Sequence, residues 1–178
     1  LKWNKVYNLT ALRDPDSVLT HHLLDSLAVI PPLQRERAGR GKLLDVGSGA
    51  GLPGVVIAIL RPDRDVTCLD AVAKKMAFVQ QVAGELVLPN LRGLHARVEK
   101  LEGRFDLISS RAFASLPDFF SGSSHLLADG GKWLAMKGKN PADELAGLPA
   151  EVAVFHVEQL TVPGLDAERC IVWARKQA

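Results

Sequence analysis

Apolar residues recur along this chain in two alternating patterns. Short apolar runs predict five buried strands, at residues 42–46, 66–70, 91–96, 105–109 and 132–137. Apolar residues at helical spacing predict a helix after four of these strands, at about 55–60, 74–88, 116–128 and 141–148. Strands that alternate with helices in this way are typical of a parallel sheet covered by helices on both faces.

Two further patterns flank this alternation. Before it, a helix is predicted to begin with Asp14 as its N-cap and Pro15 at its first position, and to end at Pro31-Pro32. After it, strand-like segments at 152–162 and 169–174 are joined by a short turn. A hairpin at this end requires one antiparallel strand in an otherwise parallel sheet.

The most informative segment is the glycine-rich turn after the first strand, Asp45-Val46-Gly47-Ser48-Gly49-Ala50-Gly51. A turn of this kind, between a strand and a helix, places backbone rather than side chains against a bound nucleotide. The acid at its head, with glycines at every second position, points to S-adenosylmethionine (AdoMet). The ammonium and sulfonium groups of AdoMet attract a nearby carboxylate such as that of Asp45.

NAD is the competing cofactor. Residues 49–54 match G-x-G-x-x-G, and Asp70 follows about 20 residues later, as the NAD pattern asks. However, the pyrophosphate of NAD needs N–H donors at the start of the helix, where Pro53 has none, and Asp45 would face a phosphate. A dehydrogenase also normally has a second domain for its substrate. We therefore rank NAD below AdoMet.

These elements predict the fold class and the domain organisation. Their order is that of an α/β, Rossmann-like class I AdoMet-dependent methyltransferase, with a mostly parallel seven-stranded sheet, helices on both faces and an antiparallel C-terminal hairpin strand. Residues 1–40 are predicted to form an N-terminal helical segment and residues 41–178 the AdoMet-binding part, within a single structural domain. Because the chain starts at Leu1 without an initiator Met, we expect a truncated start.

The composition and net charge limit the kinds of binding partner that the sequence predicts. The 178 residues are 47% apolar and 24% charged, as in ordinary globular proteins, and the net charge is only +2. Any contact with RNA must therefore come from local basic clusters. Cys68 and Cys170 lie in apolar runs and are predicted to be reduced core residues of a cytoplasmic protein. No apolar run predicts a membrane span, no spacing predicts a metal site, and nothing demands more than a monomer.

Ligands of open α/β sheets bind beyond the carboxyl ends of the strands. Asp70 ends the second strand, where a carboxylate can accept both ribose hydroxyls; we favour this role over that of a turn-forming acid because the glycine turn already predicts an acid here. Val98 is predicted to flank adenine, and Glu99 to accept a hydrogen bond or to cap a short helix. The predicted cofactor-binding residues are Gly47, Ser48, Gly49, Gly51, Leu52, Asp70, Val98, Glu99 and Arg111.

Basic residues are predicted at the same edge. Arg111 follows the fourth strand, at the position nearest the transferred methyl group in such enzymes, and either binds an anion of the cofactor or RNA or pairs with Asp45 or Asp106. Lys137 ends the fifth strand, where a solvated side chain is the alternative. The members of the predicted basic lip for RNA phosphates are Arg97, Arg111, Lys137 and Lys139.

Other candidates have plainer roles. His21 and His22 fall in the first predicted helix without further ligands at metal-binding spacing, so we expect them to pack beside the cleft. Trp3 and Tyr7 are expected to dock on the domain rather than to stack on bases, which leaves Phe113 as the better stacking candidate.

Two absences narrow the chemistry. No Asn-Pro-Pro-Tyr or Asp-Pro-Pro-Tyr tetrad follows the fourth strand, which disfavours methylation of an exocyclic amino group. No cysteine lies at the ends of the fourth or fifth strand, which disfavours covalent attack on a pyrimidine carbon. Guanine N7 fits what remains, because it has a free lone pair and no proton. Catalysis then requires positioning and electrostatics without a general base, and the predicted catalytic residues are Arg111 and Lys137.

The chain closely resembles the RsmG (GidB) family of bacterial ribosomal RNA methyltransferases, almost end to end. The continuation of the glycine turn as Leu52-Pro53-Gly54, together with Ser110-Arg111-Ala112-Phe113-Ala114, is far more specific than the glycine motif alone. The other matching segments are Asn8-Leu9-Thr10, Arg13-Asp14-Pro15, His22-Leu23-Leu24-Asp25-Ser26 and Lys137-Gly138. Family members begin with additional N-terminal helical sequence that is absent here.

The resemblance implies transfer of a methyl group from AdoMet to N7 of one guanosine in 16S ribosomal RNA near the decoding site, leaving S-adenosylhomocysteine. It implies a small ribosomal subunit or its RNA as partner. The implied cofactor contacts are Gly47, Leu52, Asp70, Val98, Glu99 and Arg111, and the implied RNA contacts are Arg97, Arg111 and Lys137. The alternatives are a methyltransferase acting on a small molecule and a non-catalytic module that binds AdoMet and RNA.

Overall fold

The computed structural model describes residues 3–4, 9–36, 41–113 and 115–177. These residues contain a seven-stranded sheet in the order β3-β2-β1-β4-β5-β7-β6. The strands are β1 (Lys42–Val46), β2 (Asp65–Asp70), β3 (Leu91–His95), β4 (Phe105–Arg111), β5 (Leu127–Lys137), β6 (Val152–Leu160) and β7 (Arg169–Lys176). Strands β1 to β5 are parallel, while β7 runs antiparallel to both β5 and β6. The predicted fold class, including its C-terminal hairpin, is confirmed.

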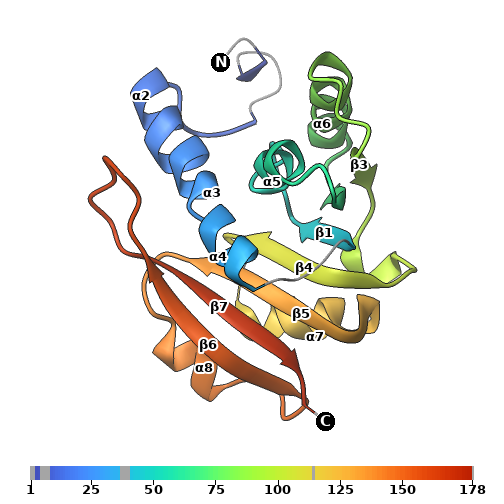
Figure 1. Ribbon diagram of the computed structural model, residues 1–178, viewed down its shortest axis with the longest axis vertical. Helices are drawn as coiled ribbons and strands as arrows, with labels where there is room; N and C mark the ends of the chain where they lie inside the picture. Colours follow the sequence, from blue (N-terminus) through green and yellow to red (C-terminus); the bar gives the residue numbers. More distant parts are fainter. Residues whose placement is uncertain (1–2, 5–8, 37–40, 114, 178) are drawn as a thin grey trace.

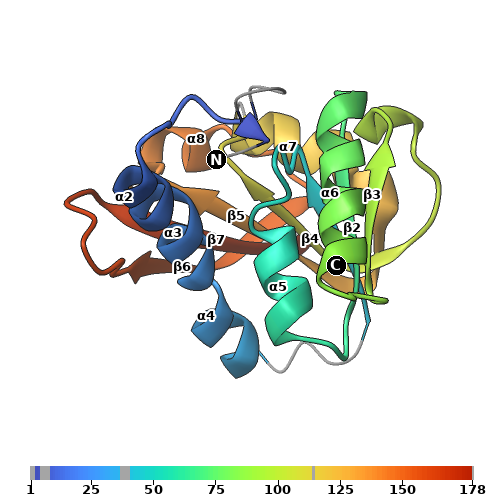
Figure 2. The same cartoon turned by 90° about the horizontal axis from the view of Figure 1, so that it is seen from above.

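Helices cover both faces of this sheet (Figures 1 and 2). On one face, α4, α5 and α6 pack on a core that includes Leu43, Leu107 and Trp173. On the other, α7 and α8 pack on a core that includes Leu44 and Trp133. The helices are α2 (Pro15–Val18), α3 (Asp25–Leu27), α4 (Ile30–Arg35), α5 (Gly54–Leu60), α6 (Ala73–Glu85), α7 (Leu116–Ser123) and α8 (Ala142–Ala146). Central strands buried from both sides explain the continuous apolar runs in the sequence.

The N-terminal segment departs from its prediction. Asp14 is the N-cap, as expected, and its carboxylate accepts a hydrogen bond from the backbone N–H of Ser17 at 2.8 Å. The single predicted helix is, however, divided into α2, a π-helical turn (Leu19–Leu24), α3 and α4. Pro31-Pro32 does not end a helix but lies in the first turn of α4. Proline is tolerated there because the first N–H groups of a helix have no acceptor within it.

The segment that leads into the fifth strand also differs from its prediction. The predicted helix 116–128 ends at Ser123 and continues as a 3-10 turn (Ser124–Leu126). The predicted turn Asp129-Gly130-Gly131 instead lies inside β5, where the pairing with β4 jumps from Phe105–Leu127 to Leu107–Lys132. Extra residues on one strand form a bulge, and Gly130 supplies the positive φ of +73° that this bulge requires.

The cysteines and Trp3 lie where the sequence predicted them. Cys68 and Cys170 are both free and buried in the core, as predicted. The Trp3 ring packs edge-on against Phe78 of α6 at a centroid distance of 5.8 Å, so Trp3 docks on the domain, as expected. Tyr7 lies outside the described residues. Within the described part of the chain, no helix is long and apolar enough to cross a membrane.

Candidate active site

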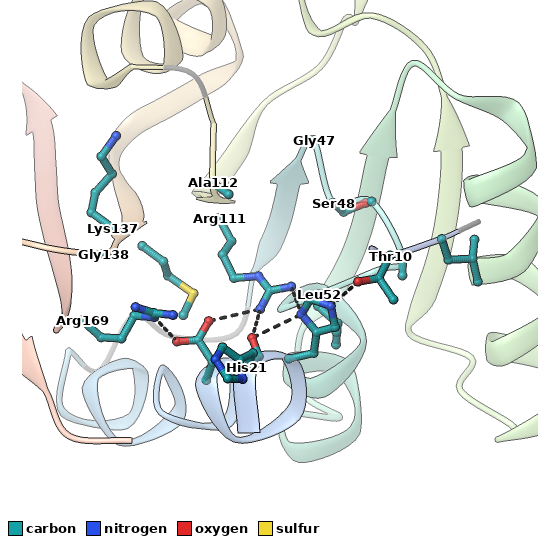
Figure 3. Close-up of a pocket in the computed structure, with 16 residues that line it drawn as sticks. Thr10, His21, Gly47, Ser48, Leu52, Arg111, Ala112, Lys137, Gly138 and Arg169 are labelled. Atoms are coloured by element: carbon teal, nitrogen blue, oxygen red, sulfur yellow. Dashed lines mark hydrogen bonds and ion pairs between the residues drawn. The ribbon is translucent and has the colours of Figure 1, made fainter. Parts of the chain in front are cut away.

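A pocket of about 520 Å³ opens at the carboxyl ends of β1, β4 and β5 (Figure 3). One wall is the glycine-rich turn between β1 and α5, and the opposite wall comes from the N-terminal segment, with Thr10, His22 and Asp25. Arg111 at the end of β4, Lys137 at the end of β5 and Arg169 at the start of β7 complete it. The pocket therefore lies where open α/β sheets bind their ligands.

The glycine turn presents backbone to this pocket. Gly49 has a φ of +58°, and a Cβ atom built on it would meet nothing within 4 Å, so the turn leaves open space at that point. Gly51 has a different reason: with a φ of +86°, its Cβ would lie 2.6 Å from Val55 and 2.9 Å from Val79. Glycine is thus favoured at position 49 by the positive φ, and it is required at position 51 for packing of the turn on α5 and α6.

Asp70 holds this turn from the end of β2. One carboxylate oxygen accepts the backbone N–H of Gly49 at 3.0 Å, and the other accepts that of Val72 at 2.9 Å. Lys75 forms an ion pair with the same carboxylate at 3.7 Å. Asp70 lies at the rim of the glycine turn but not among the pocket-lining residues, so its predicted binding of ribose hydroxyls stays a prediction.

Asp45 holds the other end of the turn, and here the interpretation from the sequence was wrong. Its side chain is fully buried instead of facing the cofactor site. Its carboxylate accepts hydrogen bonds from the backbone N–H of Gly54, at 3.0 Å, and from the hydroxyl of Ser109, at 2.8 Å. Burial raises the pKa of Asp45 to about 6, while these two hydrogen bonds and the charge of Arg111 oppose that rise. Asp45 anchors the start of α5 and joins it to β4.

Arg111 pairs with the N-terminal segment and not with Asp45 or Asp106. Its guanidinium donates to Asp25 at 3.1 Å and to the backbone carbonyl of His21 at 3.2 Å (Figure 3). Asp106 instead accepts the backbone N–H of Lys42 at the opposite end of the sheet. Because Asp25 is only 4% exposed, Arg111 is held by a buried carboxylate.

His22 lies beside this pair, as its predicted position next to the cleft requires. Its Nε2 lies 2.5 Å from the Thr10 hydroxyl, and its Nδ1 lies 3.4 Å from the Arg111 guanidinium. Burial and the nearby Arg111 charge lower the pKa of His22, which favours the neutral ring. No group of three or more metal-ligating side chains occurs among the described residues.

Lys137 occupies the far side of the pocket. Its ammonium forms an ion pair with Glu144 of α8 at 2.8 Å, and in Figure 3 the side chain points away from Arg111 and Arg169. Arg97 and Lys139 are exposed and lie outside the pocket lining. The predicted basic lip is thus divided into two paired cations inside the pocket and two exposed cations beyond it.

The structure brings together only part of the predicted set. The predicted residues that line the pocket are Gly47, Ser48, Gly49, Leu52, Arg111 and Lys137. Those outside its lining are Gly51, Asp70, Val98, Glu99, Arg97 and Lys139. Val98 is buried in the core that includes Leu44 and Trp133, and Glu99 is exposed on the same 3-10 turn (Val98–Lys100). Phe113 packs on Phe119 at a centroid distance of 5.8 Å.

Sequence reasoning missed two charged residues. Asp25 lies within the segment His22–Ser26 that the family resemblance marked, but its role was not assigned. Arg169 begins β7 and donates to Asp25 at 2.8 Å. The family resemblance was the available signal for Asp25, whereas its contact with Arg169 spans 144 positions and leaves no local pattern.

The donors around the pocket suit AdoMet. Open space at Gly49 allows close approach of a ligand to backbone, and the Asp70 carboxylate at the adjacent strand end can accept hydroxyl hydrogens. Leu52 is half-buried beside the turn and offers an apolar contact. Gly47, Gly49, Leu52 and Asp70 would hold the cofactor, and Arg111 would border its reactive end.

The fold is that of AdoMet-dependent methyltransferases. One similar solved structure is a SAM-dependent methyltransferase from Aquifex aeolicus, with a TM-score of 0.67 and 17% identity, covering 94% of this chain and 96% of that chain. Another is magnesium protoporphyrin IX methyltransferase from Synechocystis PCC 6803 with bound SAM, with a TM-score of 0.68 and 15% identity, covering 99% and 90%.

Sequence comparison names the family. A family model described as GidB, rRNA small subunit methyltransferase G, matches residues 1–172, and the chain belongs to this family. Ribosomal RNA small subunit methyltransferase G of Acidovorax sp. (strain JS42) is 65% identical over 186 residues, which cover 99% of this chain and 82% of that protein. Its counterpart in Polaromonas sp. (strain JS666) is 66% identical over 179 residues, covering 98% and 79%.

The raised pKa of Asp45 predicts a pH dependence of stability. A carboxyl whose pKa rises from 3.8 to about 6 on folding binds its proton more tightly in the folded chain. Its stabilising contribution is therefore complete below about pH 4 and is lost as the pH rises through about 6. We expect the free energy of unfolding of the wild type to fall between these values relative to Asp45→Asn, as measured by urea denaturation with circular dichroism.

Asp63→Asn is the matched control for this experiment. Arg61 lowers the pKa of Asp63 to about 2, so this carboxylate contributes with the opposite sign and at lower pH. Parallel curves for the wild type and Asp45→Asn across the window would contradict the assignment of a raised pKa to Asp45.

A second prediction concerns the cavity at Gly49. Gly49→Asp places a side chain in the open space of the pocket, so we expect loss of AdoMet binding by at least about tenfold in calorimetric titration. Gly130→Asp is the matched control because Gly130 also has a positive φ, of +73°, and open space at its Cβ, but lies on the bulge of β5. Equal effects of the two substitutions would mean that backbone strain, and not the cavity, causes the loss.

Proposed function

We propose that this protein transfers the methyl group of AdoMet to N7 of a specific guanosine in 16S ribosomal RNA near the decoding region. The observation that carries the proposal is one pocket that combines an open glycine turn with the cations of Arg111, Lys137 and Arg169. Membership of the small-subunit rRNA methyltransferase family supports ribosomal RNA as the substrate. Backbone at the turn suits a nucleoside cofactor, and cations suit an RNA substrate.

The chemistry of N7 fits the side chains that border the pocket. Bound AdoMet supplies an electrophilic methyl group on a sulfonium. Guanine N7 carries no proton, so the transfer needs no general base, and the neutral ring favoured at His22 does not have to act as one. Arg111 and Lys137 would act by orienting the base and its phosphates, which is the role of positioning in catalysis.

The proposed residue roles extend beyond the pocket lining. Gly51, Asp70, Val98 and Glu99 complete the proposed cofactor site, since Gly51 and Asp70 set the shape of the glycine turn. The exposed side chains of Arg97 and Lys139, together with Lys137, are proposed to bind RNA phosphates.

The net charge of the chain bears on whether the substrate is naked RNA or a folded ribosomal subunit. A net charge of +2 supports only modest affinity for naked RNA, so we infer that a folded small ribosomal subunit is the substrate. We also infer a cytoplasmic monomer in which residues 1–40 form a helical segment on the methyltransferase part, residues 41–178.

The direct test is transfer of labelled methyl from AdoMet to small ribosomal subunits that lack their native modification, followed by nucleoside analysis. We expect the label in N7-methylguanosine. Label in another nucleoside would overturn the N7 assignment. Transfer to a free metabolite with inert subunits would replace the RNA methyltransferase by a small-molecule methyltransferase. Tight binding of AdoMet and subunits without any product would indicate a non-catalytic module.

The role of Lys137 has its own prediction. Lys137→Ala removes a cation whose ammonium is held at the pocket by Glu144, so we expect turnover on subunits to fall by about tenfold or more while AdoMet affinity is retained. Lys132→Ala is the matched control because Lys132 lies on the same strand and is also ion-paired, to Glu36, but lies away from the pocket. Normal turnover of Lys137→Ala would remove this residue from the mechanism.

A further inference from the structure

The carboxylate of Asp25 binds two arginines at once. One oxygen accepts from Arg111 at 3.1 Å and the other from Arg169 at 2.8 Å. Asp25 is 4% exposed, whereas the side chains of Arg111 and Arg169 retain 18% and 22% of their accessible surface. All three side chains line the pocket, and the acid is the most buried of them.

This arrangement fixes both arginines from separate elements. Arg111 ends β4, Arg169 begins β7 and Asp25 starts α3, so three distant segments meet at one side chain. The remaining protein partners of the two guanidinium groups are two backbone carbonyls, of His21 and Glu168, and the His22 ring. Within the described part of the chain, Asp25 is thus the charged partner of both arginines.

Charge balance gives this contact a consequence for the ligand. The two arginines and Asp25 together carry a net charge of +1, and without Asp25 they would carry +2. AdoMet has a positively charged sulfonium where S-adenosylhomocysteine has a neutral thioether. A stronger positive field in the pocket therefore weakens binding of AdoMet more than binding of S-adenosylhomocysteine.

We propose that Asp25 is a positioning residue that holds Arg111 and Arg169 at the pocket wall and offsets one of their charges, so that the pocket accepts a cationic methyl donor. The inference rests on the proposed use of this pocket as the AdoMet site. It adds a role for the N-terminal segment, which supplies the balancing charge for the methyltransferase part.

The test compares the affinities of AdoMet and S-adenosylhomocysteine by calorimetry on the full chain. Asp25→Asn is expected to lower the AdoMet affinity, relative to that of S-adenosylhomocysteine, by about three- to tenfold, the effect of one charge across a partly solvated pocket. Arg169→Gln is expected to shift the ratio in the opposite direction. The double variant restores the net charge of +1 and is expected to return the ratio toward the wild-type value.

Positioning is separated from charge by Asp25→Glu. This variant keeps the charge but displaces the carboxylate, so we expect a nearly wild-type affinity ratio together with a lower kcat on small subunits. Asp63→Asn is the matched control: it also breaks an arginine pair, with Arg61, but at the surface and away from the pocket.

Three results would overturn the inference. If the ratio of the two affinities is unchanged in both Asp25→Asn and Arg169→Gln, the charge role is excluded. A normal kcat in Asp25→Glu would exclude the positioning role. If Asp25→Asn does not fold, the ratio in Arg169→Gln alone decides the charge role. If Gly49→Asp leaves both affinities unchanged, the ligands bind elsewhere, and the proposed function of this pocket fails together with the inference.

Discussion

Two carboxylates fix the turn between β1 and α5 by accepting hydrogen bonds from its backbone, and the rest of the site depends on these hydrogen bonds. Asp70 holds the backbone of Gly49, and Asp45 holds the first N–H of α5 at Gly54. These hydrogen bonds are needed because glycine is the most flexible residue, so a turn rich in glycine loses much conformational entropy on folding. The two acids belong to adjacent strands, so the geometry of the sheet determines where the backbone of the turn lies at the pocket.

The site also has to reconcile two ligands of opposite charge. The methyl donor is a cation at sulfur, whereas the RNA substrate is a polyanion. In the proposed site the cations are already paired, Arg111 and Arg169 to Asp25 and Lys137 to Glu144. Paired cations keep donors for a phosphate or a base, while their field on the donor's sulfonium is reduced.

The sheet was predictable because each of its strands leaves a local pattern of apolar residues in the sequence. Buried parallel strands such as Lys42–Val46 and Asp65–Asp70 appear as short segments rich in apolar residues, and the glycine turn between them has its own signature. The errors arose where context overrides a local signal. Pro31-Pro32 suits the first turn of a helix as well as the end of one, and Gly130 suits a bulge as well as a turn.

The site was predictable only in part, for a related reason. Strand ends and glycines predict that Gly49, Arg111 and Lys137 lie at one cleft, and all three line the pocket, but ion-pair partners are determined by tertiary packing. Asp45 illustrates the limit, because an acid after a strand looks the same in sequence whether it faces a ligand or the interior. Similarly, the sequence offers several acids for Arg111, and the selected one, Asp25, lies 86 positions away.

The meeting of Asp25 with Arg169 also bears on how the enzyme is made. During synthesis from the N-terminus, the glycine turn and Asp25 are complete long before β7 leaves the ribosome. Arg169 reaches Asp25 only once β7 lies between β5 and β6, because the two residues are 144 positions apart in the sequence. The cluster of Asp25, Arg111 and Arg169 is therefore completed only after β7 has been synthesised, later than the glycine turn on the opposite wall of the pocket.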